Sequence, residues 1–133
     1  MSSTQDETDE LNRLSNEVIG AAIEVHRHLG PGLLESAYES CLNWELRQRG
    51  LIVELQVPVP IHYKELLLDE GYRIDFLVEG KLVLELKSID KLLPIHTAQV
   101  LTYLKMTGLK MALLLNFNIE LMRSGIKRIV NDF

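Results

Sequence analysis

Residues 71–87, Gly71-Tyr-Arg-Ile-Asp-Phe-Leu-Val-Glu-Gly-Lys-Leu-Val-Leu-Glu-Leu-Lys87, have the pattern of two strands joined by a tight turn. Side chains alternate between the two faces of a strand, so Glu85 and Lys87 share one face. The alternating leucines of the second strand form an apolar face, which leaves the charged pair on the opposite side. Together with Asp75, this pair could hold a hard divalent cation and activate a water. The pattern therefore points to phosphodiester hydrolysis.

The length of the turn decides whether these residues can meet. With a two-residue loop at Glu79-Gly80, Asp75 lies opposite Leu84, so Asp75 and Glu85 point to opposite faces. With a three-residue loop, residues 79–81, Asp75 lies opposite Glu85 and shares its face. A site built on both carboxylates therefore requires an odd loop or a bulge.

An ordinary explanation competes with the site, because Asp75 on a solvated strand face could simply pair with Arg73 or Lys87. The apolar run at residues 82–86 instead indicates a central strand, and central strands seldom carry charge without a reason. In such a strand, the backbone carbonyl of Leu86 is a further candidate oxygen ligand.

Composition suits one globular domain. The chain has 133 residues, 47% of them hydrophobic, and its formal net charge is −5. Residues 1–9 are polar and acidic and are expected to form a disordered tail, with a single domain at residues 10–133. Outside the acidic segment the charges nearly balance, which argues against tight non-specific DNA binding.

No apolar stretch reaches the length of a membrane span, and the N-terminus lacks the pattern of a signal peptide. The single cysteine, Cys41, cannot form an intramolecular disulfide. Both observations fit a protein of a reducing cytoplasm.

Apolar residues at three- and four-residue steps predict a helix at residues 11–29, which Gly30-Pro31-Gly32 ends. Pro58 and Pro60 restrict the first strand to an edge or a bent position. The order of elements predicts one α/β or α+β domain with a mixed central sheet flanked by helices. Further helices are expected at residues 33–49 and 94–106, strands at 52–63, 71–78, 81–87, 111–117 and 126–130, and a connection at 65–70.

The helices add two candidates to the site. Glu35 begins the second helix, where an acidic residue could equally well complement the helix dipole. Gln99 lies with His96 and Tyr103 along the third helix, and its amide could orient water or bind a phosphate oxygen. For His96 and Tyr103, a solvent-facing stripe is the simpler explanation.

Gly32-Leu-Leu-Glu35-Ser-Ala-Tyr38 matches the heptapeptide for which the bacterial GxxExxY proteins are named. The similarity continues to residues 115–117, through 71–75, 85–87 and 99–103, so the chain resembles that family over nearly its whole length. That family looks like a small branch of the PD-(D/E)xK nuclease superfamily. The resemblance implies a restriction-endonuclease-like core with a helix, three antiparallel strands, a helix and another strand.

The resemblance also implies roles for individual residues. Asp75 and Glu85 would be metal ligands for Mg²⁺ or Mn²⁺, together with the Leu86 carbonyl and with Glu35 as a further candidate. Lys87 would be the catalytic lysine. Glu35 and Gln99 would complete the catalytic set from the preceding and following helices.

Two functions follow from this pattern. The first is a metal-dependent nuclease that acts on DNA or RNA. The second is a non-catalytic binding or scaffold module that keeps the nuclease fold. By analogy, a nuclease this small can work as a homodimer or with a protein partner. Calorimetry with Mn²⁺ separates the two functions, because a scaffold needs no metal site.

Overall fold

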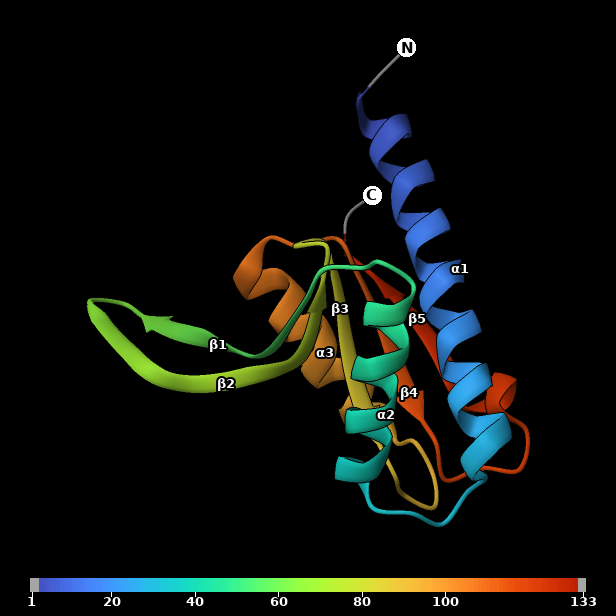
Figure 1. Ribbon diagram of the computed structural model, residues 1–133. Helices are drawn as coiled ribbons and strands as arrows, with labels where there is room; N and C mark the ends of the chain where they lie inside the picture. The colour runs from blue at the N-terminus through green and yellow to red at the C-terminus, as the bar shows by residue number, and fades with distance from the viewer. Residues whose placement is uncertain (1–2, 132–133) are drawn as a thin grey trace.

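The computed structural model describes residues 3–131, which form a mixed five-stranded sheet with helices on both faces (Figure 1). The predicted fold class is confirmed. The elements are α1 (Ser3–Leu29), α2 (Glu35–Gln48), β1 (Val53–Tyr63), β2 (Leu66–Val78), β3 (Leu82–Lys87), α3 (Pro94–Thr107), β4 (Met111–Asn116), a 3-10 turn (Met122–Gly125) and β5 (Ile126–Val130).

The strands follow one another across the sheet in the order β1-β2-β3-β4-β5. β1, β2 and β3 are antiparallel neighbours, and β5 is antiparallel to β4. β3 and β4 are parallel, and α3 provides the crossover that parallel neighbours require. β1 is an edge strand, as its two prolines predicted.

Each face of the sheet has its own apolar core. Leu82, Leu84 and Leu86 of β3 pack with α1 and α2. Val83 packs instead with the buried residues of α3 on the other face. β3 is thus covered on both sides, and Glu85 shares the α3 side with Val83.

The hairpin between β2 and β3 has the three-residue loop that the site requires. Phe76 pairs with Leu84 and Val78 with Leu82, which leaves residues 79–81 as the loop. This register places Asp75 opposite Glu85, so the prediction that both carboxylates share a face is confirmed.

β2 and β3 pair only from Phe76 to Val78, and before that point β2 separates from β3 while it stays paired with β1. It continues with β1 as a long hairpin arm, defined here as residues 60–70, that projects from the body of the protein (Figure 1). The expected connection at residues 65–70 is therefore wrong, since β2 begins at Leu66. Residues 66–68 form a strand because they pair with β1, and no local sequence pattern predicts this pairing.

The N-terminal segment also differs from its expectation. α1 begins at Ser3, so residues 3–9 of the expected tail at 1–9 are helical, while residues 1–2 lie outside the described part. Asp6 in the first turn complements the helix dipole, and Gln5 donates a hydrogen bond to Asp9 one turn later. Glu10 forms an ion pair with Lys81, which ties this end of α1 to the β2–β3 loop.

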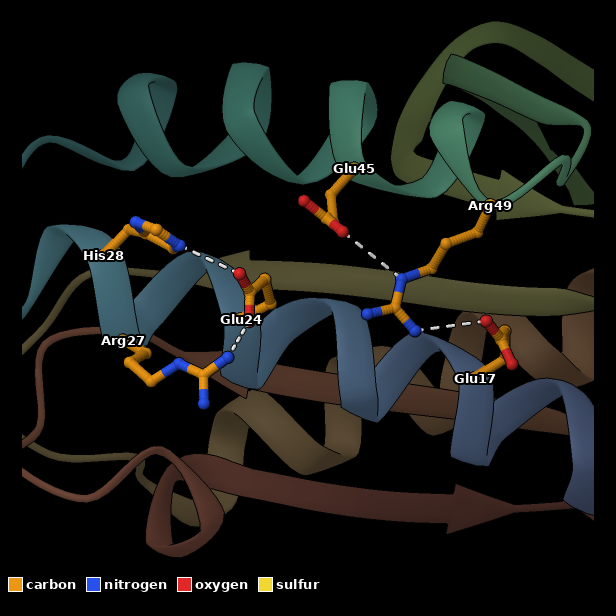
Figure 2. Close-up of polar contacts among 6 residues, drawn as sticks. All are labelled: Glu17, Glu24, Arg27, His28, Glu45 and Arg49. Carbon is orange, nitrogen blue, oxygen red and sulfur yellow. Dashed lines mark hydrogen bonds and ion pairs between the residues drawn. The ribbon is translucent and has the colours of Figure 1, made fainter.

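α1 and α2 lie side by side on their face of the sheet, and Figure 2 shows the polar contacts along them. Arg49 lies 3.1 Å from Glu17 of α1 and 3.4 Å from Glu45 of α2. Glu24 pairs with Arg27 and His28 within α1. Exposed pairs of this kind add at most about 1 kcal/mol each, so the shared apolar core holds the two helices. Among residues 3–131, no helix has the length and apolar character of a membrane crossing.

Candidate active site

The two predicted carboxylates lie at the point where β2 and β3 separate. The Asp75 N–H donates to Glu85 Oε1 at 3.2 Å, and the Leu86 N–H donates to Asp75 Oδ2 at 2.9 Å. Side-chain oxygens thus accept from backbone groups where the ladder between the two strands ends. These bonds hold both carboxylates at the fork of the sheet.

Burial makes this pair electrostatically costly. Glu85 is 7% exposed, and burial together with the neighbouring charge of Asp75 raises its pKa to about 8. Burial also raises the pKa of Asp75, against the hydrogen bond from Leu86 and the charge of Lys87. The positive charge of Lys87 lowers the pKa of both carboxyls and so opposes the effect of their burial.

α2 brings Glu35 to the same place. The pKa of Glu35 is raised by partial burial and by the charge of Asp75, and is lowered by Lys87. These charge effects support the predicted approach of Glu35 to the carboxylates, which stays a prediction, and Glu35 also occupies the first turn, where it complements the dipole. Glu39, one turn later on α2, has its pKa raised by burial and then by Asp75.

Tyr38 explains how α2 is held in this position. Its ring is fully buried and stacks on Phe117, with 4.7 Å between the ring centroids. Its hydroxyl donates to the Gly30 carbonyl at 2.6 Å and accepts from the Leu33 N–H at 3.1 Å. Gly32, with φ +95°, supplies a conformation that other residues rarely adopt. The glycine and tyrosine of the heptapeptide motif, Gly32 and Tyr38, thus fix the loop before α2 and with it the position of Glu35.

Gln56 of β1 was not predicted and lies between two carboxylates. Its Nε2 donates to Glu39 Oε2 at 3.4 Å, and its side-chain amide lowers the pKa of Asp75. One amide NH₂ has two hydrogens, which suits two acceptors. Its backbone has φ +52°, an uncommon conformation for a residue other than glycine, and such strain is often found at functional sites.

α3 contributes a residue other than the one expected. Tyr103 is buried, and burial followed by the charge of Glu85 raises its pKa to about 12, with smaller effects from Tyr72 and Asp75. Gln99 is exposed one turn earlier, and within the described residues no hydrogen bond or ion pair joins it to a carboxylate. His96 accepts from the Leu93 N–H and caps the start of α3.

The donor set suits Mg²⁺ or Mn²⁺ better than a softer metal, because Asp75, Glu85 and the Leu86 carbonyl offer hard oxygen ligands. Within residues 3–131, no three Asp, Glu, His or Cys side chains are close enough to form a ready-made site. Mg²⁺ commonly binds one or two carboxylates and keeps several waters, so half-buried Asp75 and buried Glu85, both with raised pKa values, still fit such an ion.

Three residues near the site went unnoticed in the sequence. Glu39 could have been found, because it lies four residues after Glu35 and so shares its helix face. Gln56 and Tyr72 could not have been found in this way. The left-handed backbone of Gln56 and the separation of β2 from β3 near Tyr72 leave no periodic pattern in the sequence.

Comparison with known proteins gives one family. A family model described as PD-(D/E)XK nuclease superfamily matches residues 12–129, a range that holds Glu35, Asp75, Glu85 and Lys87. No curated protein and no solved structure matches the chain.

Proposed function

The chain belongs to the PD-(D/E)XK nuclease superfamily, and we propose that it hydrolyses phosphodiester bonds of DNA or RNA with Mg²⁺ or Mn²⁺. One observation carries the proposal: half-buried Asp75 and buried Glu85 are held together at the fork between β2 and β3, burial raises both carboxyl pKa values, and the charge of Asp75 raises that of Glu85 further. A divalent cation would stabilise the charged form of both carboxylates, so raised carboxyl pKa values favour a site that binds a cation.

Each residue of the site has a separate task. Asp75, Glu85 and the Leu86 carbonyl hold the cation, with Glu35 nearby as a further ligand. A bound divalent cation would polarise the phosphate and lower the pKa of a bound water. Lys87 orients the attacking water and stabilises the negative charge that develops on the phosphate. Gln99, an exposed residue of α3, would support the phosphate.

The finer assignments are proposed on the same basis. The GxxExxY branch is supported by the way Gly32 and Tyr38 shape the loop that presents Glu35. Work in a bacterial cytoplasm follows from the resemblance to that branch and agrees with a single cysteine. Residues 10–133 act as one nuclease domain, alone, as a homodimer or with a protein partner.

The test is cleavage of labelled single- and double-stranded DNA and RNA with Mg²⁺ or Mn²⁺. Wild-type protein is expected to cleave at least one substrate, whereas Asp75→Asn and Glu85→Gln remain folded and lose both activity and metal affinity. Thermal melts with and without Mn²⁺ report metal binding separately. A melt indifferent to millimolar Mn²⁺, with no cleavage, would favour a non-catalytic scaffold.

A further inference from the structure

An aromatic ring stands partly in solvent beside the carboxylates. Tyr72 of β2 is 50% exposed, and its ring centroid lies 5.4 Å from that of Tyr103, with 42° between the ring planes. Tyr103 is 7% exposed, so the Tyr72 ring packs against a buried ring. One part of the Tyr72 side chain is thus packed against a buried partner, and the rest is open to a ligand.

The backbone holds Tyr72 in place. Tyr72 pairs with Val59, which is 1% exposed and belongs to the core under α3. At Gly71 a Cβ atom would lie 2.0 Å from the Val59 carbonyl oxygen, so only glycine permits this approach of β1 and β2. The register shift between Val59 and Ile61 falls at the same point. Tyr72 therefore stands at a fixed position where the arm joins the body.

Tyr103 connects Tyr72 to the catalytic groups. The charges of Glu85 and Asp75 and the neighbouring Tyr72 all act on the Tyr103 hydroxyl. Tyr103 thus contacts the exposed Tyr72 ring, at 5.4 Å between ring centroids, and is itself influenced by the charges of both carboxylates. A nucleotide base placed on Tyr72 would leave its own backbone close to the carboxylates.

The charge of the protein limits how it can hold a nucleic acid. The chain has 14 basic and 19 acidic residues, so binding by phosphate neutralisation alone would be weak. Stacking of bases on aromatic rings tolerates an acidic surface, because it uses the uncharged face of the base. Bases inside a duplex cover one another's faces and cannot stack on a protein ring, whereas unpaired bases can.

We propose that Tyr72 stacks on an unpaired nucleobase and that the substrate is therefore single-stranded DNA or RNA, or an unpaired segment of either. This inference rests on the proposed nuclease function and adds the substrate class. Single strands are selected because Tyr72 can stack on their unpaired bases while a phosphodiester bond of the same strand lies at Asp75 and Glu85.

The experiment measures the binding of fluorescein-labelled 15-nucleotide DNA and RNA strands and of the matching DNA duplex by fluorescence anisotropy, in EDTA to prevent cleavage. Tyr72→Ala is expected to weaken single-strand binding by about 5- to 150-fold, the range for loss of one stacked base. Tyr72→Phe keeps the ring and should bind like the wild type. Separate DNA and RNA strands show which sugar the site accepts.

Tyr63→Ala is the matched control. Tyr63 is a 61% exposed residue of the arm itself, and it pairs with Leu66 at the far end of the hairpin from Tyr72. Its removal should leave single-strand affinity unchanged. Tyr72→Leu keeps apolar bulk without an aromatic face and should bind as weakly as Tyr72→Ala, which covers the case in which alanine disturbs folding.

Four results would overturn the inference. The first is an equal loss of single-strand affinity in Tyr72→Ala and Tyr63→Ala, and the second is an equal loss of affinity for duplex and single strands in Tyr72→Ala. The third is the absence of single-strand binding by the wild type. The fourth is a change of oligomeric state in Tyr72→Ala without a change in affinity, which would assign this face to a protein partner. Because binding is read in EDTA, it can fail while metal-dependent cleavage succeeds. Conversely, cleavage can fail while base stacking is confirmed.

Discussion

Replacing Glu85 by glutamine should stabilise the metal-free protein, because a carboxyl group placed to bind a cation is unfavourable when no cation is bound. In the folded protein the pKa of Glu85 is about 8, against an ordinary value of 4.5. At pH 7 the folded state keeps a proton that the unfolded chain has lost, which costs roughly 3 kcal/mol of folding free energy. A glutamine carries no such charge and can still accept the bond from the Asp75 N–H.

The sign of the pH dependence follows from the direction of this shift. Below pH 4.5 both states hold the proton and Glu85 costs nothing, whereas between pH 4.5 and pH 8 wild-type stability falls steadily. Glu85→Gln should lack this part of the slope. For a chain of this size the gain at pH 7 corresponds to a melting temperature roughly 10 °C higher, at about 4 °C per kcal/mol.

Urea unfolding in EDTA at pH 5, 7 and 8.5 measures the effect, with Glu54→Gln as the control at an exposed position of β1. The wild type should lose stability relative to Glu85→Gln as the pH rises, and Mn²⁺ should stabilise only the wild type. The reasoning is refuted if Glu85→Gln is less stable than the wild type at pH 7, or if the two proteins have the same pH dependence.

Other substitutions separate catalysis from structure. Lys87→Ala should keep Mn²⁺ affinity in calorimetry and lose turnover, and parallel loss of both would remove its assigned role. Tyr38→Phe should cost about 1–3 kcal/mol in urea unfolding, because the Leu33 N–H and a glycine carbonyl lose their partner. Gln56→Gly should leave stability unchanged or raise it by about 1 kcal/mol, since glycine tolerates the left-handed conformation, and it should weaken Mn²⁺ binding. An unchanged Mn²⁺ affinity would show that Gln56 is merely structural. Gly71→Ala should destabilise by about 1–3 kcal/mol or more in thermal melts, and an unchanged melt would contradict the close approach at that point.

Local patterns in the sequence determined most elements of this fold. The apolar periodicity of α1, the run of leucines in β3 and the proline at the start of α3 each act within one segment. Helical and strand periodicities arise from the backbone geometry of that segment, so they can be read without knowing its neighbours. The same reasoning identified Asp75 and Glu85 as a pair that needs a common face.

Contacts between distant segments decided the rest. The sequence allowed two loop lengths after Val78, and pairing across the sheet selected the one that joins the carboxylates. The strand at Leu66–Leu68 and the approach of Tyr103 rather than Gln99 depend on how β1 and α3 pack. Chain geometry alone cannot report such choices, because their free energies come from burial and pairing between residues far apart in sequence. The chain thus carried the chemistry of the site in its residue types, while tertiary packing decided which of those residues meet.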